Sequence, residues 1–412
     1  MIRLLKTFFH FVRRQLAKIW LRLHPQVKII AITGSYGKTN TSRAVEAVLK
    51  NHLETIVTDT NLDTTYNLPI TLLKINKKTQ IAILEYCIDK KGEMEQHLNL
   101  VKPDIAIITG ITPVHSEKNM LGSIKGIIEE KGKLLEALPK GGRAILNFDD
   151  PRVVKMAQKA PCPIISYGKK KTFDFYFDKA TVTKRGTIFW AHFKKGNKKI
   201  SKKINLRLLG QHFAQEALAA LAIAKVLNID PNRAISSLEK LSPLPGRMSL
   251  ENGPNGSLLI NDSLRANPAS TIAGLKTLST IEHSGKRIAV LGEMGELGQY
   301  QEKEHYRVGQ FIGQLKNIDF LITLGPATKK IVQGAIEAGM NKNQIFYTKN
   351  HQETAEILKK FLDSKTVWYL KGSLLKHVER IPMILEGKEV ACQKISCHNY
   401  YHCSKCKELN PG

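Results

Sequence analysis

The sequence predicts an α/β protein whose first part is a doubly wound, mostly parallel sheet, followed by a smaller α/β unit of Rossmann-like type. Three observations support this prediction. The chain has 412 residues, more than one hydrophobic core usually supports. Short apolar runs alternate with helical segments, which is the pattern of βαβ units. A glycine-rich loop joins the first of these runs to the next helix, as in phosphate-binding folds.

Composition and charge narrow the class of protein. Hydrophobic residues make up 42% and charged residues 24%, which excludes a disordered or collagen-like chain. The chain has 63 Lys and Arg against 36 Asp and Glu, a net charge of +27, so its surface should attract polyanions such as nucleic acid, acidic lipid headgroups or phosphorylated substrates. Four of the six cysteines follow residue 391. They form no disulfide framework, and we expect a reducing compartment, the cytoplasm.

Residues 1–26 are predicted to form a basic amphipathic helix. Residues 1–24 contain six basic residues and no acidic one, and no apolar stretch is long enough to span a bilayer. Apolar residues recur at helical spacing, as in a helix lying on anionic lipid at the inner face of a membrane. The alternative is a helix docked on its own domain by that stripe. The stripe comprises Leu5, Phe8, Phe9, Val12, Leu16, Ile19, Trp20 and Leu23.

Residues 27–242 are predicted to be a nucleotide-binding domain that begins with a P-loop. An apolar strand, 27–32, leads into a glycine-rich loop and then a helix. Glycines let backbone N–H groups approach phosphate oxygens, Lys38 can reach the β- and γ-phosphates, and the Thr39 hydroxyl can hold Mg²⁺. The loop is one residue shorter than the general pattern, so a structural glycine turn is the alternative. The loop residues are Gly34, Ser35, Tyr36, Gly37, Lys38 and Thr39.

Polar residues follow three further strand-like runs. Glu85 ends the run 80–84, His115 follows the run 105–109, and Asn147 follows the run 144–146. The helix predicted at 121–137 carries Lys131. Because ligands bind at the carboxyl ends of parallel strands, we expect a site at this edge of the sheet.

Taken in order, these motifs resemble the Mur ligase family of ATP-dependent amide-bond ligases in peptidoglycan synthesis, and most of all its MurF type, which joins D-Ala-D-Ala to a muramyl tripeptide. The resemblance runs from about residue 28 to about residue 388. Besides the residues above, the motifs that match the family are residues 131–132, 147–150, 209–212, 245–247, 262–268, 291–298 with His305, and 371–373.

The resemblance implies that ATP phosphorylates a substrate carboxylate and that an amine attacks the resulting acyl phosphate. Lys38, His115 and Lys131 would be the catalytic residues. Thr39 and Glu85 would bind one Mg²⁺, and His115 a second. Lys131 would be carbamylated and would help to position that second ion. Asn147, Arg247 and Asp262 would contact ATP.

By the same resemblance, residues 243–388 would form a C-terminal domain that closes over the nucleotide. The segment Pro243–Gly246 is a credible hinge. Strands are predicted at 287–291, 320–324 and 366–370. We expect a monomer that acts on an anionic cell-wall peptide precursor and an amino acid or dipeptide.

The sequence departs from the MurF pattern at several places. The P-loop begins at residue 34, which leaves room for the basic helix but not for the UDP-binding domain that precedes the P-loop in MurF. A membrane-linked or otherwise UDP-independent acceptor is therefore one hypothesis. Leu264 and Arg265 stand where MurF has Tyr and Asn, so the amine need not be D-Ala-D-Ala. The alternatives are MurT-like lipid II modification, folylpolyglutamate-type glutamate ligation, and a non-catalytic ATP-binding scaffold at the membrane.

Two further segments are distinctive. Residues 169–203 hold twelve Lys and Arg against two Asp, a net charge of +10. We predict a hairpin with one solvated basic face there, and expect no nucleic-acid partner. The tail, 389–412, offers four thiolates for a tetrahedral structural Zn²⁺, with unpaired thiols or redox chemistry as the alternatives. The candidate ligands are Cys392, Cys397, Cys403 and Cys406.

Overall fold

The computed structural model describes residues 2–59, 63–195, 198–397 and 402–409. The chain divides into two compact units. The first comprises residues 1–180, 189–206 and 212–241, and the second comprises residues 181–188, 207–211 and 242–412.

The first unit is built on a nine-stranded sheet of order β2-β3-β1-β4-β5-β6-β7-β8-β9. The pairings from β2 through β7 are parallel, which confirms the predicted doubly wound, mostly parallel sheet. The strands are β1 (Lys28–Thr33), β2 (Thr55–Val57), β3 (Ile81–Glu85), β4 (Ile105–Ile108), β5 (Arg143–Asn147), β6 (Ile164–Gly168), β7 (Phe175–Thr183), β8 (Gly186–Lys195) and β9 (Lys198–Leu206). The basic stretch 169–203 thus contributes the last three strands to one edge of this sheet.

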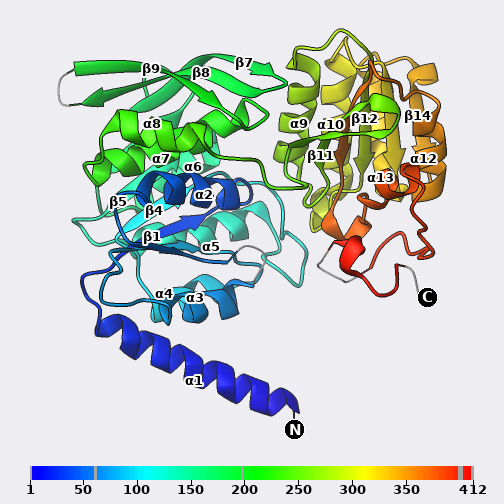
Figure 1. Ribbon diagram of the computed structural model, residues 1–412. Coiled ribbons are helices and arrows are strands. Elements are labelled where there is room, and N and C mark those ends of the chain that lie inside the picture. The colour runs from blue at the N-terminus through cyan, green and yellow to red at the C-terminus, as the bar shows by residue number, and fades with distance from the viewer. Residues whose placement is uncertain (1, 60–62, 196–197, 398–401, 410–412) are drawn as a thin grey trace. The chain divides into compact units, whose positions relative to one another are not determined.

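Helices cover both faces of this sheet (Figure 1). One layer contains α2 (Lys38–Leu49), α7 (His212–Val226) and α8 (Pro231–Glu239), and the other contains α3 (Thr64–Leu72), α4 (Glu93–Leu100), α5 (Ile124–Glu136) and α6 (Pro151–Met156). Strand β1 is buried from Ile29 to Thr33. A nearly continuous apolar run is expected when both faces of a strand are covered.

The basic N-terminal segment forms helix α1 (Ile2–Arg22), which packs against α3 and α4. Ala17 of this helix is fully buried in the core of the first unit. Across the described ranges, the structure contains no helix both long and apolar enough to cross a membrane.

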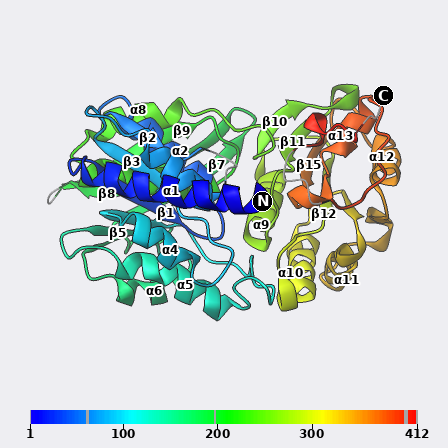
Figure 2. The same cartoon turned by 90° about the horizontal axis from the view of Figure 1, so that it is seen from below.

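The second unit has a six-stranded sheet of order β10-β11-β15-β12-β13-β14, in which only β10 is antiparallel to its neighbour. Its strands are β10 (Ser249–Asn252), β11 (Leu258–Asp262), β12 (Arg287–Gly292), β13 (Phe320–Leu324), β14 (Ile345–Thr348) and β15 (Val367–Lys371). Helices α9 (Pro268–Thr280), α10 (Gln301–Gln314) and α11 (Lys329–Glu337) form one layer, and α12 (His351–Lys359) and α13 (Arg380–Leu385) the other (Figure 2). The predicted second α/β unit is confirmed.

Candidate active site

The glycine-rich loop between β1 and α2 has the backbone geometry of a phosphate cradle. Gly34 and Gly37 have φ angles of 149° and 74°, in the region that favours glycine. A Cβ atom on Gly34 would lie 2.0 Å from Thr109 Oγ1, so no side chain fits there. Lys38 is the first residue of α2, so the unpaired N–H groups of that helix terminus adjoin the loop.

Two side chains of this loop lie close to neighbouring backbone. Lys38 Nζ donates to Gly34 O at 2.8 Å, so the amine folds back over its own loop. Ser35 Oγ donates to Thr112 O at 3.2 Å. The loop is therefore held against the segment that follows β4. Tyr36, also in this loop, is buried, and this burial raises the pKa of its phenol well above the usual value.

Thr39 and Glu85 meet at the carboxyl edge of the sheet. Glu85 is the last residue of β3, the parallel neighbour of β1, and Thr39 Oγ1 donates to Glu85 Oε2 at 3.3 Å. A hydroxyl and a carboxylate are oxygen ligands of the kind that Mg²⁺ prefers. The residues therefore fit a magnesium ion that would take both oxygens as ligands.

Lys131 lies on α5 with a side chain that is almost wholly buried. Burial, and to a smaller extent the positive charge of Lys38, lowers the pKa of its amine to about 7. A large part of the Lys131 population is therefore neutral near pH 7. The influence of Lys38 also indicates that Lys131 shares the electrostatic environment of the P-loop.

His115 is held in a left-handed backbone conformation, with a φ angle of 69°. Its Nδ1 lies 2.9 Å from Ile88 O and 3.2 Å from Asp89 Oδ1. With the proton on Nδ1, the lone pair resides on Nε2, which is the form in which histidine binds metals. His115 is thus suited to act as a metal ligand.

Asn147 is buried at the end of β5 and organises the backbone around it. Its Nδ2 donates to Thr109 O at 2.8 Å, and its Oδ1 accepts from Asp149 N at 3.1 Å. A contact between Asn147 and ATP stays a prediction.

In the second unit, the predicted nucleotide contact Asp262 lies in a buried ion pair. Asp262 ends β11 and Lys371 ends β15, and the parallel register places them side by side. Lys371 Nζ and the Tyr369 hydroxyl both donate to Asp262 Oδ2. Burial raises the pKa of Asp262 and lowers the pKa of Lys371. The positive charge of Arg247 lowers the pKa of both groups.

Comparison with known proteins decides the family. Residues 32–224 match the Mur ligase middle domain, and residues 246–374 match the Mur ligase, glutamate ligase domain. UDP-N-acetylmuramoyl-tripeptide–D-alanyl-D-alanine ligase of Bacillus subtilis is 32% identical over 325 residues, which cover 79% of this chain and 68% of that enzyme. The chain belongs to the Mur ligase family. It is therefore an ATP-dependent acid–amino-acid ligase, as the resemblance of its motifs implies.

Further relatives agree with this assignment. The enzyme of the same name from Buchnera aphidicola subsp. Baizongia pistaciae is 32% identical over 373 residues, or 89% of this chain and 76% of the relative. A crystal structure of MurF from Acinetobacter baumannii superposes with a TM-score of 0.82 at 25% identity, covering 92% of this chain and 81% of that one. Folylpolyglutamate synthase of Mycobacterium tuberculosis shares the fold, with a TM-score of 0.66 at 17% identity over 92% of this chain and 95% of that one.

Within this Mur ligase, sequence reasoning missed Glu130. This carboxylate is buried, accepts from Gly92 N at 2.8 Å and Met94 N at 3.2 Å, and pairs with Lys133. Gly92 is the N-cap of α4 and has no side chain to cap that helix. Glu130 therefore supplies the cap from α5, one residue before Lys131. Its sequence neighbour Glu129 is exposed, and nothing local distinguishes the two.

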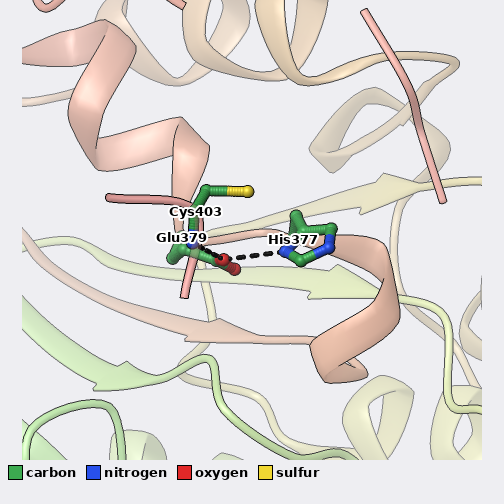
Figure 3. Close-up of side chains that lie close together, drawn as sticks. All are labelled: His377, Glu379 and Cys403. Carbon is green, nitrogen blue, oxygen red and sulfur yellow. Dashed lines mark hydrogen bonds and ion pairs between the residues drawn. The ribbon is translucent and has the colours of Figure 1, made fainter. Parts of the chain in front are cut away.

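The tail places one of its cysteines in a polar cluster on the second unit. In the part of the chain that the structure describes, ligand atoms of His377, Glu379 and Cys403 lie within 4.8 Å of one another (Figure 3). His377 Nδ1 lies 2.9 Å from Glu379 Oε1, and Arg380 Nε donates to Cys403 Sγ at 3.1 Å. Burial raises the pKa of Cys403 to about 12.

The other tail thiols lie outside this cluster. Cys397 Sγ is 2.8 Å from His377 Nε2, on the opposite side of the ring from Glu379. Arg380 also donates to the carbonyl oxygens of Cys392 and Lys394. The tail is therefore tied to the second unit by polar contacts, and a zinc ion bound by four thiolates stays a prediction.

Proposed function

We propose that this Mur ligase is a MurF-like enzyme that joins an amino acid or dipeptide to a carboxylate of an anionic cell-wall peptide precursor in the cytoplasm. The observation that carries this proposal is the contact of Thr39 in the P-loop with Glu85, together with the burial of Lys131 on α5 of the same unit. Relatives named UDP-N-acetylmuramoyl-tripeptide–D-alanyl-D-alanine ligase support the choice of substrate class.

The first chemical step transfers the γ-phosphoryl group of ATP to a carboxylate oxygen of the precursor, which forms an acyl phosphate and ADP. The amine then attacks the acyl carbon, the new C–N bond replaces the C–O bond to phosphate, and a proton leaves the nitrogen. Lys38 and the N-terminus of α2 would neutralise charge on the transferred group. The protein's contribution is thus mainly positioning and electrostatics.

Two magnesium ions would fit the oxygen and nitrogen donors of the first unit. Thr39 and Glu85 would hold one, and His115 with a carbamylated Lys131 would hold the other. Magnesium, when bound, neutralises phosphate charge. Lys131 supports this arrangement because only a neutral amine condenses with CO₂, giving a carbamate anion and a proton.

Replacement of Lys131 tests the proposed mechanism. We expect Lys131→Ala to lower phosphate release in the presence of both substrates by roughly a hundredfold or more, and added acetate or formate to restore part of it by supplying the missing anion. Lys125→Ala is the matched control, since Lys125 is an exposed lysine of the same helix. Unchanged turnover in Lys131→Ala would remove this residue from the mechanism.

The identity of the substrates is tested by combining each candidate amine with each candidate carboxylate. Amino acids, D-Ala-D-Ala and ammonia should be combined with UDP-linked peptide, lipid-linked peptide and folate, with phosphate release as the readout. We expect turnover with a cell-wall peptide and an amino acid or dipeptide. Turnover with ammonia and a lipid-linked acceptor would indicate MurT-like chemistry, and turnover with folate and glutamate a folylpolyglutamate-type ligase. ATP binding with no turnover in any combination would indicate a scaffold.

A further inference from the structure

Helix α1 is attached to the first unit by one of its faces. Ala17 is buried among the core residues of that unit. The Trp20 indole N–H donates to Ile75 O at 2.8 Å, and Arg14 Nη2 donates to Gln96 O at 2.7 Å. Figures 1 and 2 show α1 along the outside of the α3 and α4 layer. The face of α1 that docks on the unit thus uses a small, a basic and an aromatic side chain, and most of the predicted apolar stripe takes no part in the docking.

Five apolar side chains of the stripe point away from this attachment. We call them the outward face: Phe8, Phe9, Leu16, Ile19 and Leu23, which are 61%, 65%, 53%, 54% and 66% exposed. Single exposed apolar residues are ordinary, but four on α1 together with Leu23 directly after it form a patch that indicates an interaction site. Because the opposite face already holds α1 in place, the fold of the unit does not require the outward face.

The basic residues beside the outward face indicate which kind of surface can bind it. The described part of α1 carries basic residues and no acidic ones, and helical periodicity places Arg13 on one flank of the outward face and Lys18 and Arg22 on the other. A second copy of the chain would bring these cations together, which opposes self-association. An anionic lipid headgroup layer over an apolar interior complements both features at once.

We propose that the outward face of α1 binds the surface of an anionic lipid bilayer, with the helix parallel to the membrane plane. The apolar side chains would enter below the headgroups, and the flanking basic side chains would extend to the lipid phosphates. The first unit would then be held at the membrane through the other face of the same helix. This proposal is independent of the ligase chemistry.

Vesicle co-sedimentation of the full-length chain tests the proposal. The probes are vesicles of phosphatidylcholine alone and vesicles that also contain phosphatidylglycerol. We expect wild type to bind the anionic vesicles, and the double variant Leu16→Ser/Ile19→Ser to bind them at least about tenfold more weakly. Val154→Ser/Ile164→Ser is the matched control, because these two apolar side chains are exposed elsewhere on the same unit. It should bind like wild type.

A charge variant and a folding control complete the experiment. Lys18→Gln/Arg22→Gln should weaken binding to the anionic vesicles by about fivefold or more, and added salt should weaken wild-type binding. We expect ATP to raise the melting temperature of every variant by as much as that of wild type. Wild type left in the supernatant with anionic vesicles, or equal binding by Leu16→Ser/Ile19→Ser, would overturn the proposal. A wild-type dimer that this variant dissociates, with no vesicle binding, would assign the face to self-association instead.

Discussion

Lys131 is the residue whose proposed chemistry depends most on its surroundings. Its pKa of about 7 arises from burial first and from the charge of Lys38 second. Protonation of the amine increases as pH falls through 7, and a protonated amine cannot form a carbamate. We expect ligation to fall by roughly tenfold for each unit below about pH 6, measured as ADP release in bicarbonate buffer. The acetate-supplemented Lys131→Ala variant should lack this acid limb, and a limb shared by both would contradict the assignment.

Glu85 provides a separate test of the magnesium assignment. Removal of its charge should raise the Mg²⁺ concentration for half-maximal activity by about tenfold or more, because a neutral amide is a weaker ligand for a hard cation. A magnesium titration of Glu85→Gln measures the change. Glu129→Gln removes an equal charge from an exposed site on α5 and should titrate like wild type. Equal magnesium requirements in all three proteins would exclude Glu85 as a ligand.

Helix α4 depends on a side chain from another helix. Glu130 on α5 accepts from two backbone N–H groups at the start of α4. We expect Glu130→Ala to lower the free energy of unfolding by about 2 kcal/mol or more, because one buried and one partly buried backbone donor lose a charged acceptor. Denaturant unfolding of Glu130→Ala and of the exposed neighbour Glu129→Ala measures this. A comparable, small loss in both variants would show that the cap contributes little.

Strands β11 and β15 are joined by the buried pair of Asp262 and Lys371. Asp262→Asn would leave the buried amine of Lys371 without its counterion, which should destabilise the second unit by about 3 kcal/mol. Calorimetry would detect this as a lower melting temperature. The control Asp363→Asn alters an exposed pair with Lys286 and should have little effect. A wild-type melting temperature in Asp262→Asn would contradict a structural role for the pair.

The cysteine tail is tested by metal analysis. A four-thiolate site predicts about one zinc per chain in the purified protein, lost in Cys406→Ser. In the structure, Cys403 instead contacts Arg380 and lies beside His377 and Glu379. These contacts must rearrange before four thiolates can bind one zinc ion. Less than about 0.2 zinc per chain would reject the zinc prediction.

Across the whole chain, the net charge of +27 divides into parts with different surroundings. Six of these charges belong to residues 1–24, where the exposed apolar side chains of α1 favour a lipid surface. Ten belong to residues 169–203, which contribute β7, β8 and most of the edge strand β9 to the first sheet. These two segments together carry sixteen of the 27 net charges, so more than half of the basic excess is concentrated in particular elements.

The sequence by itself determined the features that depend on residues adjacent to one another in the chain. Seven strands (β1, β3, β4, β5, β12, β13 and β15) could be predicted because each is a contiguous apolar run. The P-loop could be predicted because residues 34–39 hold its glycines, lysine and threonine together, and the family followed from several such motifs in order. These features are local, so no packing information is needed to recognise them.

Only the tertiary structure decided which distant residues meet. The family resemblance implies that Thr39 and Glu85 share one Mg²⁺, and the structure gives the physical reason for their contact, which is that β1 and β3 are parallel neighbours. The rotation of α5 against the sheet decides that Glu130 and Lys131 are buried while Glu129 is exposed. Likewise, the sequence predicted an apolar stripe on α1, but the packing of that helix decided which side chains remain exposed. Burial and register are long-range properties, and they set the pKa of Lys131 and the surface offered by α1.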